Sequence, residues 1–327
     1  MSNPRTLAPD GTVREMHYTD TPRFIQIETN LACNAACPFC PYVHMERGPK
    51  FMADAVWKKI VDETRGLGIT YRPFLINEPL SERRLPEILR YIKEDSSART
   101  EINSNGGLMT EKKAKETLDA GLDVARFSVD GFSRQTYEPA RPGVDYDAVV
   151  RNVNRFVEIR DAGGYDCFTE VRMIDMPENR HEHTAYLEYW HPRVDSALIV
   201  PLYRWPWEGQ EAPVQKPCLK ILDEMFFYTD GTAPICCWDS AGRGLVGDVT
   251  KESVLDIWNG PVMKAMRDLL NRGRRDLIHL CSRCDAYKDV NFVDFDGVEA
   301  PASSDVARVQ PLPAARTLPL RGAAGQA

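Results

Sequence analysis

Long apolar stretches are missing from this sequence of 327 residues, in which no window approaches the roughly 18 consecutive apolar residues that a membrane helix needs. The first 22 residues contain no apolar segment of the kind that defines a secretory signal, so we expect a cytoplasmic protein. An excess of basic charge is missing as well, since 41 Lys and Arg stand against 48 Asp and Glu, for a net charge of −7. This balance argues against binding to nucleic-acid phosphates or to an anionic membrane, and we expect neither as a partner.

The number of cysteines is odd, so they cannot all be paired in disulfides within the chain. The nine cysteines, without a secretory signal, are not typical of a disulfide framework; in a reducing compartment such cysteines are more often metal ligands or catalytic groups. Their positions predict two sites on two structural units. Three lie close together near the start, one lies alone in the middle and five fall in the final third: Cys33, Cys37, Cys40; Cys167; Cys218, Cys236, Cys237, Cys281 and Cys284.

Short β-like runs alternate with helical stretches from about residue 23 to residue 204. We predict a helix over Asp147–Arg160 from its apolar periodicity, and another from an N-cap at Thr110 to Ala120, with Gly121 just beyond its end. Six strand–helix units imply an α/β fold with a parallel sheet covered by helices, and six are too few for a closed eight-fold barrel. We therefore expect a partial (β/α)6 TIM-like barrel, with strands at Phe24–Glu28, Phe74–Ile76, Glu101–Asn103, Val124–Val129, Phe168–Ile174 and Ala197–Val200.

The composition of the sequence changes after a turn-like segment at Trp205–Gly209, where cysteine, glycine and tryptophan recur among short elements. We predict an N-terminal extension at residues 1–22, the barrel at 23–205 and a small cysteine-rich domain at 206–299. The last stretch, 300–327, is rich in Ala and Pro with little large apolar content, and we expect a disordered tail.

Polar residues recur on one face of several predicted strands. Arg126 and Ser128 alternate with apolar neighbours in the fourth strand, and Glu170 and Arg172 do so in the fifth. A packed barrel interior is normally apolar, and buried polar groups without partners are costly. The pattern predicts a cavity that holds a polar ligand, with an exposed sheet face as the alternative.

The first cysteine group, Cys33-x3-Cys37-x2-Cys40, directly follows the first predicted strand, at the end of the barrel where active sites lie. Three thiolates from one loop suit a cubane iron–sulfur cluster and leave its fourth iron open to a ligand. The alternative is structural zinc, which needs four ligands, and no fourth cysteine lies before Cys167.

This loop resembles the signature of radical S-adenosylmethionine (SAM) enzymes, and Phe39 is part of the match. The resemblance continues along the barrel. Asn77-Glu78-Pro79 stands where the superfamily usually has Gly-Gly-Glu-Pro, and Ser104-Asn105-Gly106 resembles its Thr-Asn-Gly turn. Ser128-Val129-Asp130-Gly131 resembles the end of its fourth strand.

The resemblance implies that the open iron of a [4Fe–4S] cluster on Cys33, Cys37 and Cys40 chelates the amino and carboxylate groups of SAM. It implies that a 5′-deoxyadenosyl radical is formed and that a flavodoxin- or ferredoxin-type donor supplies the electron. Glu78 is expected to accept from the ammonium of SAM. The other residues that we expect at the cofactor are Phe39, Asn77, Asn105, Ser128, Asp130 and Arg172.

The later cysteines resemble the auxiliary domain attached to many radical SAM enzymes, in its SPASM type or its truncated twitch version. The resemblance implies a second [4Fe–4S] cluster on Cys218, Cys236, Cys281 and Cys284, with a zinc ribbon as the alternative. Cys237 is left over. We interpret it as a buried small residue, as the ligand in place of Cys236, or as a thiol that donates a hydrogen atom to a substrate radical.

The spacing of these four cysteines is similar to that of the 2-deoxy-scyllo-inosamine dehydrogenases of aminoglycoside biosynthesis. We therefore expect oxidation of a secondary alcohol in a small polar metabolite, in natural-product biosynthesis, with Arg204 beside the substrate hydroxyl as a charge that stabilises the alkoxide. The alternatives are a radical epimerase with Cys237 as donor, a peptide-modifying enzyme and a non-catalytic iron–sulfur electron carrier.

Overall fold

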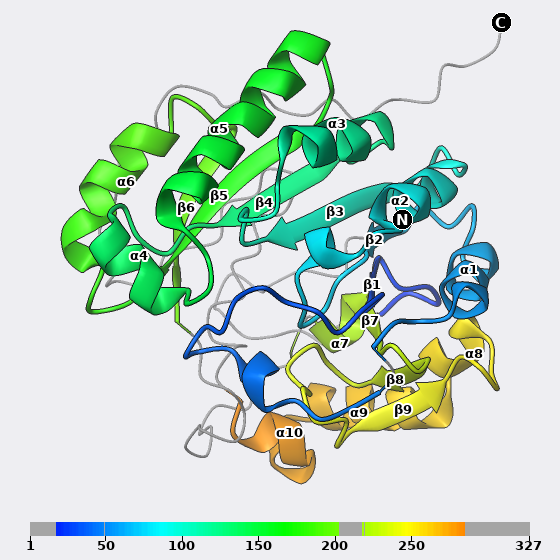
Figure 1. The fold of residues 1–327 in the computed structure, drawn as a ribbon. Helices are drawn as coiled ribbons and strands as arrows, with labels where there is room; N and C mark the ends of the chain where they lie inside the picture. The colour runs from blue at the N-terminus through cyan, green and yellow to red at the C-terminus, as the bar shows by residue number, and fades with distance from the viewer. Residues whose placement is uncertain (1–17, 49, 203–217, 219, 285–327) are drawn as a thin grey trace, which may run out of the picture.

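A seven-stranded parallel sheet forms the centre of the molecule in a computed structural model that describes residues 18–48, 50–202, 218 and 220–284 (Figure 1). The strand order is β6-β5-β4-β3-β2-β1-β7. This arrangement confirms the predicted α/β partial barrel. The strands are β1 Phe24–Ile27, β2 Thr70–Arg72, β3 Arg99–Ser104, β4 Val124–Ser128, β5 Phe168–Asp175, β6 Ser196–Pro201 and β7 Glu224–Phe227.

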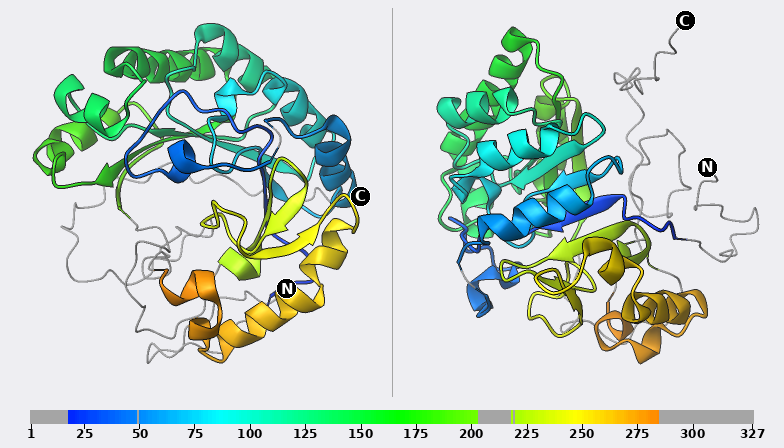
Figure 2. Two further views of the ribbon diagram at one scale, coloured as in Figure 1. Left: turned by 60° about the horizontal axis from the view of Figure 1, so that its bottom comes forward. Right: turned by 90° about the vertical axis from the view of Figure 1, so that its right-hand side faces the viewer.

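Helices cover the convex face of this sheet as an arc (Figure 2). The predicted caps are present at both ends of α3: the Thr110 side chain accepts from Lys113 N at its start, and Gly121, with φ +87°, follows its end. On α5, Phe156 packs edge-on against Phe127 of β4 with ring centroids 5.3 Å apart. The covering helices are α1 Asp54–Glu63, α2 Leu85–Lys93, α3 Glu111–Asp119, α4 Arg134–Ala140, α5 Tyr146–Gly163 and α6 His183–Trp190.

The second strand is not where the sequence predicted it. The apolar run Phe74–Ile76 is a buried loop, and the strand is Thr70–Arg72. Pro73 explains the difference, because proline has no backbone N–H to donate to the sheet and ends the pairing. Phe74 N donates to Arg72 O at 2.7 Å, which turns the chain immediately after the strand.

A seventh strand was missed. β7 lies in the segment assigned to the second domain, yet it pairs parallel with β1, with Phe24 opposite Glu224 and Ile27 opposite Phe227. All four of its residues are buried, so the strand lacks the polar–apolar alternation that would have indicated it. The cysteine-rich segment thus extends the barrel sheet.

The remaining C-terminal elements pack beside β1, β7 and α1, on the side of the sheet away from β6 (Figures 1 and 2). β8 and β9 form an antiparallel pair, and the apolar core here joins Ile25 and Trp57 to Phe227 and Trp258. The elements are α7 Lys220–Asp223, β8 Thr232–Pro234, β9 Leu245–Asp248, α8 Val254–Trp258, α9 Pro261–Asn271 and α10 His279–Ser282, with 3-10 turns η1 Pro41–His44, η2 Pro79–Ser81, η3 Arg180–Glu182 and η4 Arg275–Leu277.

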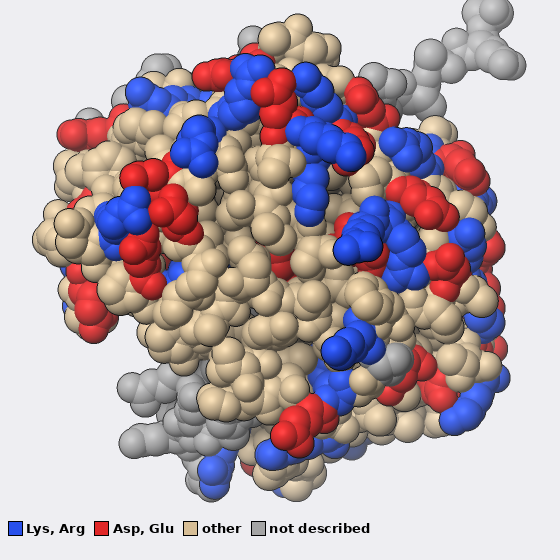
Figure 3. Space-filling view, viewed as in Figure 1, with Lys and Arg blue, Asp and Glu red and all other residues tan. Residues whose placement is uncertain are grey.

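The surface in Figure 3 shows acidic and basic residues interspersed around a largely uncharged centre. No patch of one sign dominates that face. Within the described residues, no helix is long and apolar enough to span a membrane. Residues 1–17 and the predicted tail, 300–327, lie outside the described residues.

Candidate active site

The three cysteines of the first group lie in the loop after β1, at the carboxyl end of the sheet. The loop is tied at both ends, because Cys33 N donates to the Tyr42 hydroxyl at 2.9 Å and Cys40 N donates to Cys37 O at 3.0 Å. Burial raises the pKa of the Cys33 thiol to about 11, and the charges of Glu78, Cys37 and Cys40 act in the same direction. The three sulfurs therefore lie close enough to interact, and binding of iron would release their protons.

Glu78 lies at the carboxyl end of the β2 unit and is 2% exposed. Its Oε1 accepts from Leu80 N at 3.0 Å and from Ser104 Oγ at 2.8 Å, and its Oε2 accepts from Asn105 N at 2.8 Å. Burial raises the pKa of Glu78, while these three donors oppose the increase. A carboxylate has about four acceptor positions, so one stays available for an external ammonium. The sequence assigned Glu78 only to the cofactor. In the structure its carboxylate also connects the end of β3 with the loop after β2 through these hydrogen bonds.

Two asparagines near Glu78 bind the protein itself. Asn105 Nδ2 donates to Asn34 Oδ1 of the cysteine loop at 2.8 Å, and Asn105 Oδ1 accepts from Gly107 N at 2.9 Å. Asn77 Nδ2 donates to Asn30 Oδ1 at 3.1 Å. Both asparagines thus lie where the sequence put them, at the carboxyl end of the sheet, and they brace the cysteine loop and the end of β1.

Ser128, the last residue of β4, is the cross-strand partner of Arg172 within β5. The Arg172 side chain is 33% exposed and bonds through Nε to Glu170; within the described residues, neither of its Nη atoms has a hydrogen-bond partner. Burial lowers the pKa of Arg172, and the neighbouring cations Arg126 and Arg72 also lower it. A carboxylate beside these Nη atoms and the Ser128 hydroxyl would relieve that repulsion.

Both carboxylate oxygens of Asp130 accept hydrogen bonds from within the protein. It is fully buried, with Oδ1 accepting from Ile174 N at 2.8 Å and Oδ2 held by Arg141 at 2.6 Å. Phe39 is half-buried against the apolar core under β4, with the Arg141 guanidinium 5.8 Å from its ring centroid. Arg204 lies outside the described residues.

Seven charged side chains form a ladder across the concave face of the sheet, which the strand parity predicted only in part. Arg126 joins Glu101 at 2.7 Å and Glu170 at 3.2 Å, and Arg72 joins Glu101 at 2.7 Å and Glu224 at 3.4 Å. The cations and carboxylates alternate, so that almost every buried charge has a partner of opposite sign. The members of this charge ladder are Arg172, Glu170, Arg126, Glu101, Arg72, Glu224 and Lys220.

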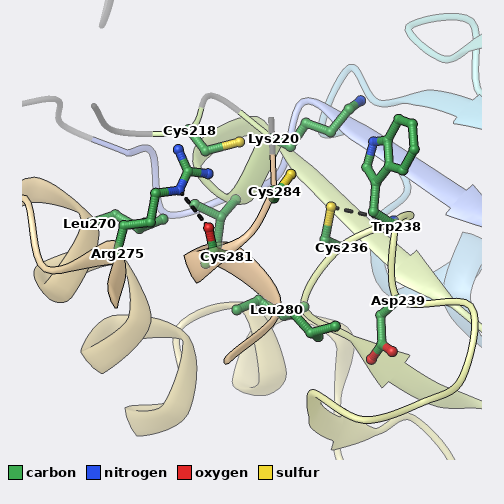
Figure 4. A pocket seen from close by; sticks show the side chains of 12 residues that line it. Cys218, Lys220, Cys236, Trp238, Asp239, Leu270, Arg275, Leu280, Cys281 and Cys284 are labelled. Atoms are coloured by element: carbon green, nitrogen blue, oxygen red, sulfur yellow. Dashed lines mark hydrogen bonds between the residues drawn. The ribbon is translucent and has the colours of Figure 1, made fainter. Parts of the chain in front are cut away.

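The four later cysteines line one pocket, although they come from three separate segments (Figure 4). The sulfurs of Cys218, Cys236 and Cys284 point toward a common space, and Arg275 Nε holds the Cys281 carbonyl at 3.0 Å. Burial raises the pKa of Cys281 to about 12. Lys220, at one end of the charge ladder, also lines this pocket.

Cys236 and Cys237 differ in their surroundings. Cys236 lines the pocket, and Cys237 is not among the residues that line it. The Cys237 thiol interacts first with the Cys236 thiol and then with the charges of Lys220, Glu224 and Arg72. The lining of the pocket favours Cys236 over Cys237 as the fourth thiol, and the choice between them stays a prediction. Cys167 is buried in the core.

The donor sets fit iron–sulfur clusters. Both consist of thiols alone, three in one and four in the other, and thiolates are the usual ligands of such clusters. Among the described residues, no group of three or more His, Cys, Asp or Glu side chains is placed around a single metal ion. A cluster spreads its ligands over several irons and accommodates more widely separated sulfurs than zinc does.

Residues 27–188 match the sequence profile of the Radical SAM superfamily, and residues 218–285 match that of SPASM, an iron–sulfur cluster-binding domain. The chain is therefore a radical SAM enzyme with a SPASM domain. The first match covers β1 to α6 with the three-cysteine loop, and the second begins and ends next to the outer cysteines of the four-cysteine pocket. SAM and iron–sulfur cluster binding follow from these two domains.

Curated relatives match less than half of the chain. A probable GTP 3′,8-cyclase of Methanococcus maripaludis is 28% identical over 147 residues, which are 44% of this chain and 49% of the relative. A PqqA peptide cyclase of Bradyrhizobium diazoefficiens is 27% identical over 111 residues, 34% of this chain and 29% of the relative. The chain thus spans about half or less of the length of these relatives.

Solved structures share the fold over a longer span. BtrN in complex with AdoMet and 2-DOIA superposes with a TM-score of 0.57 at 17% identity, covering 81% of this chain and 93% of that one. SuiB of Streptococcus suis bound to the precursor peptide SuiA gives 0.62 at 12% identity, covering 76% and 67%. At such identities the similarity establishes the architecture alone.

Proposed function

We propose that this enzyme oxidises a secondary alcohol of a small polar metabolite, such as an aminocyclitol or a sugar, in natural-product biosynthesis. Bound SAM would supply a 5′-deoxyadenosyl radical that removes a hydrogen atom from the carbinol carbon. The hydroxyl group would lose its proton to the solvent or to a base, and the second cluster would accept the remaining electron, which leaves the ketone. A flavodoxin- or ferredoxin-type protein would supply electrons to the first cluster. We also propose that the barrel domain spans residues 23–205 and the cysteine-rich domain spans residues 206–299.

The observation that carries this proposal is the pocket of four cysteines. A cluster with four protein thiolates has no open iron, so it is suited to accept or pass on an electron rather than to bind a substrate. Lys220 links this pocket to the charge ladder through Glu224, at 3.0 Å. The concave face between the two cysteine sites is thus polar and is suited to a hydroxylated substrate.

Each of the following residues has a proposed role in binding SAM or the substrate. Arg172 and Ser128 are placed to hold the carboxylate of SAM, and the fourth acceptor position of Glu78 is placed to hold its ammonium. Asn77 and Asn105 keep the surrounding loops in place. Arg204 remains our proposal for the group beside the substrate hydroxyl. The spacing similarity to 2-deoxy-scyllo-inosamine dehydrogenases, and the fold shared with BtrN, solved with AdoMet and 2-DOIA, support this assignment.

Anaerobic reconstitution with iron and sulfide, followed by dithionite, SAM and a panel of cyclitols and sugars, tests the proposal. We expect 5′-deoxyadenosine together with a product that is two hydrogens lighter than its substrate, measured by mass spectrometry. Cys236→Ala should reduce the iron content from about eight to about four per chain and abolish the product while 5′-deoxyadenosine still forms. A product of unchanged mass would contradict alcohol oxidation.

One observation favours a second candidate, a radical epimerase. Cys237 lies beside the charge ladder and outside the four-cysteine pocket, where a thiol could donate a hydrogen atom to a substrate radical. For an epimerase, Cys237→Ala abolishes the product and deuterium from the solvent enters it. For a dehydrogenase, Cys237→Ala retains the product and no solvent deuterium is incorporated at carbon.

A further inference from the structure

Arg141 contacts one of the three cysteines of the radical SAM loop, although it lies more than a hundred residues further along the chain. Its Nη1 is 3.7 Å from Cys37 Sγ, within hydrogen-bond distance for a sulfur acceptor. Its other two nitrogens, Nε and Nη2, are each 2.6 Å from Asp130 Oδ2. The guanidinium is thus held between a carboxylate and a cysteine sulfur.

The position of this guanidinium is fixed by its surroundings. Asp130 is fully buried and is itself anchored at the end of β5, where its Oδ1 accepts from Ile174 N at 2.8 Å. The Arg141 side chain is 11% exposed and is permanently charged. Two guanidinium nitrogens bound to one buried carboxylate oxygen limit the orientation of the guanidinium, and the third nitrogen, Nη1, is the one near Cys37.

The residues after Arg141 hold the same cysteine loop through its backbone. Ala36 N donates to Pro142 O at 2.8 Å. Gly143 has φ +94°, and a side-chain carbon at this position would lie 2.5 Å from Asn34 O. The segment Arg141–Gly143, between α4 and α5, therefore packs against the loop between Cys33 and Cys37 with both its backbone and its one charged side chain.

We propose that Arg141 is a positioning residue that raises the reduction potential of the cluster bound by Cys33, Cys37 and Cys40. Reduction adds a negative charge to a cluster, and a nearby cation stabilises the reduced form more than the oxidised form. Hydrogen bonds to the ligating sulfurs act in the same direction, and net charge and such bonds are among the protein's means of setting the potential. Arg141 supplies both effects at Cys37, and Asp130 supplies the orientation.

The test is a potentiometric titration of the reconstituted holoenzyme without SAM, followed by electron paramagnetic resonance, for wild type, Arg141→Gln and Arg141→Lys. We expect Arg141→Gln to make the first cluster about tenfold harder to reduce, which corresponds to about 59 mV for one electron. Arg141→Lys keeps the charge but cannot reach both Asp130 and Cys37, so a smaller shift in the same direction is expected.

Two controls separate this role from a general loosening of the fold. The second cluster in the same molecule should keep its midpoint in every variant. Arg160→Gln removes another buried arginine, which binds Asp195 and Asp161 near the amino end of β5, and should shift neither midpoint. An unchanged first midpoint in Arg141→Gln, or equal shifts in both clusters, would overturn the proposal. Should Arg141→Gln not assemble the first cluster, Arg141→Lys decides: a lower midpoint supports the role, and a wild-type midpoint refutes it.

Discussion

Arg47 binds Glu28 with both of its terminal nitrogens, at 2.6 and 2.8 Å, and reaches the cysteine-rich segment at the same time. Its Nε donates to Ser240 O at 2.8 Å, and its guanidinium lies 3.6 Å from the ring centroid of Tyr228. Glu28 is fully buried at the end of β1. This pair therefore connects the loop that carries the first three cysteines with the segment that carries Cys236.

Removing Arg47 should be strongly destabilising, because the Glu28 carboxylate would be left buried without its cation. We expect Arg47→Ala to lower the free energy of unfolding by about 3–5 kcal/mol, measured by urea denaturation of the holoenzyme. Arg134→Ala is the matched control: Arg134 also bonds with several carboxylates, but its side chain is 45% exposed, so a much smaller loss is expected. Equal losses in the two variants would contradict the role assigned to the Glu28–Arg47 pair.

The charge ladder predicts a specific dependence of stability on pH. Burial on its own would raise the pKa of Glu101, but the adjacent guanidiniums of Arg72 and Arg126 outweigh burial and bring the pKa down to about 2. A carboxyl group whose pKa is lower in the folded state stabilises the fold above its unfolded pKa of about 4.5, and this contribution is lost as the pH falls toward 2.

Glu101→Gln removes that titration. The variant should be less stable than wild type at pH 7, and the difference in urea midpoint should shrink as the pH falls from about 5 toward 2. Glu116→Gln serves as the control, because Glu116 pairs only with the exposed Lys112, and its difference from wild type should stay small throughout. A difference for Glu101→Gln that does not change with pH would show that the lowered pKa does not contribute to stability.

The sequence predicted the parts of the molecule whose signals are local. The caps of α3 and the apolar face of α5 are indicated by short, periodic patterns. The cysteine spacing indicates the three-cysteine loop and the four-cysteine pocket. The strand at Phe74–Ile76 failed because an apolar loop and a strand look alike when Pro73 is ignored. β7 failed because a strand buried on both faces has no alternation.

Some residues near the site were not predicted from the sequence, for a different reason. Arg141 and Arg47 reach the cysteine loop and Glu28 only after the chain has folded, and nothing in their local sequence indicates those partners. Asp130 was assigned to the cofactor because its motif matches, and the structure adds a contact that the motif does not indicate, since its carboxylate binds Arg141. A motif indicates that a residue is near the site, but only the tertiary contacts show what it binds.

A substitution at Gly143 tests how closely the Arg141–Gly143 segment must approach the cysteine loop. Gly143→Ala combines a left-handed φ with a contact of 2.5 Å to Asn34 O, so the backbone must move, at a cost of about 1–3 kcal/mol or more. Gly164→Ala is the matched control, because its φ of +65° is also left-handed but nothing lies within 4 Å of the added carbon. We expect Gly143→Ala alone to lower the iron bound at the first site, measured by iron analysis and absorbance. Similar iron contents in both variants would argue against this close contact.

The Arg172 side chain leads to a prediction about the cofactor, because its Nη atoms have no hydrogen-bond partner among the described residues and its position on β5 is opposite Ser128 on β4. Charge-assisted hydrogen bonds contribute about 1.5–3 kcal/mol, so Arg172→Gln should weaken SAM binding by about ten- to a hundredfold, and Ser128→Ala by less. The measurement is equilibrium binding of labelled SAM to the reconstituted, oxidised enzyme. Decarboxylated SAM is the control ligand: it lacks the carboxylate, so wild type and Arg172→Gln should bind it equally well. If Arg172→Gln weakens both ligands alike, Arg172 acts through Glu170 and the charge ladder, and the carboxylate of SAM binds elsewhere.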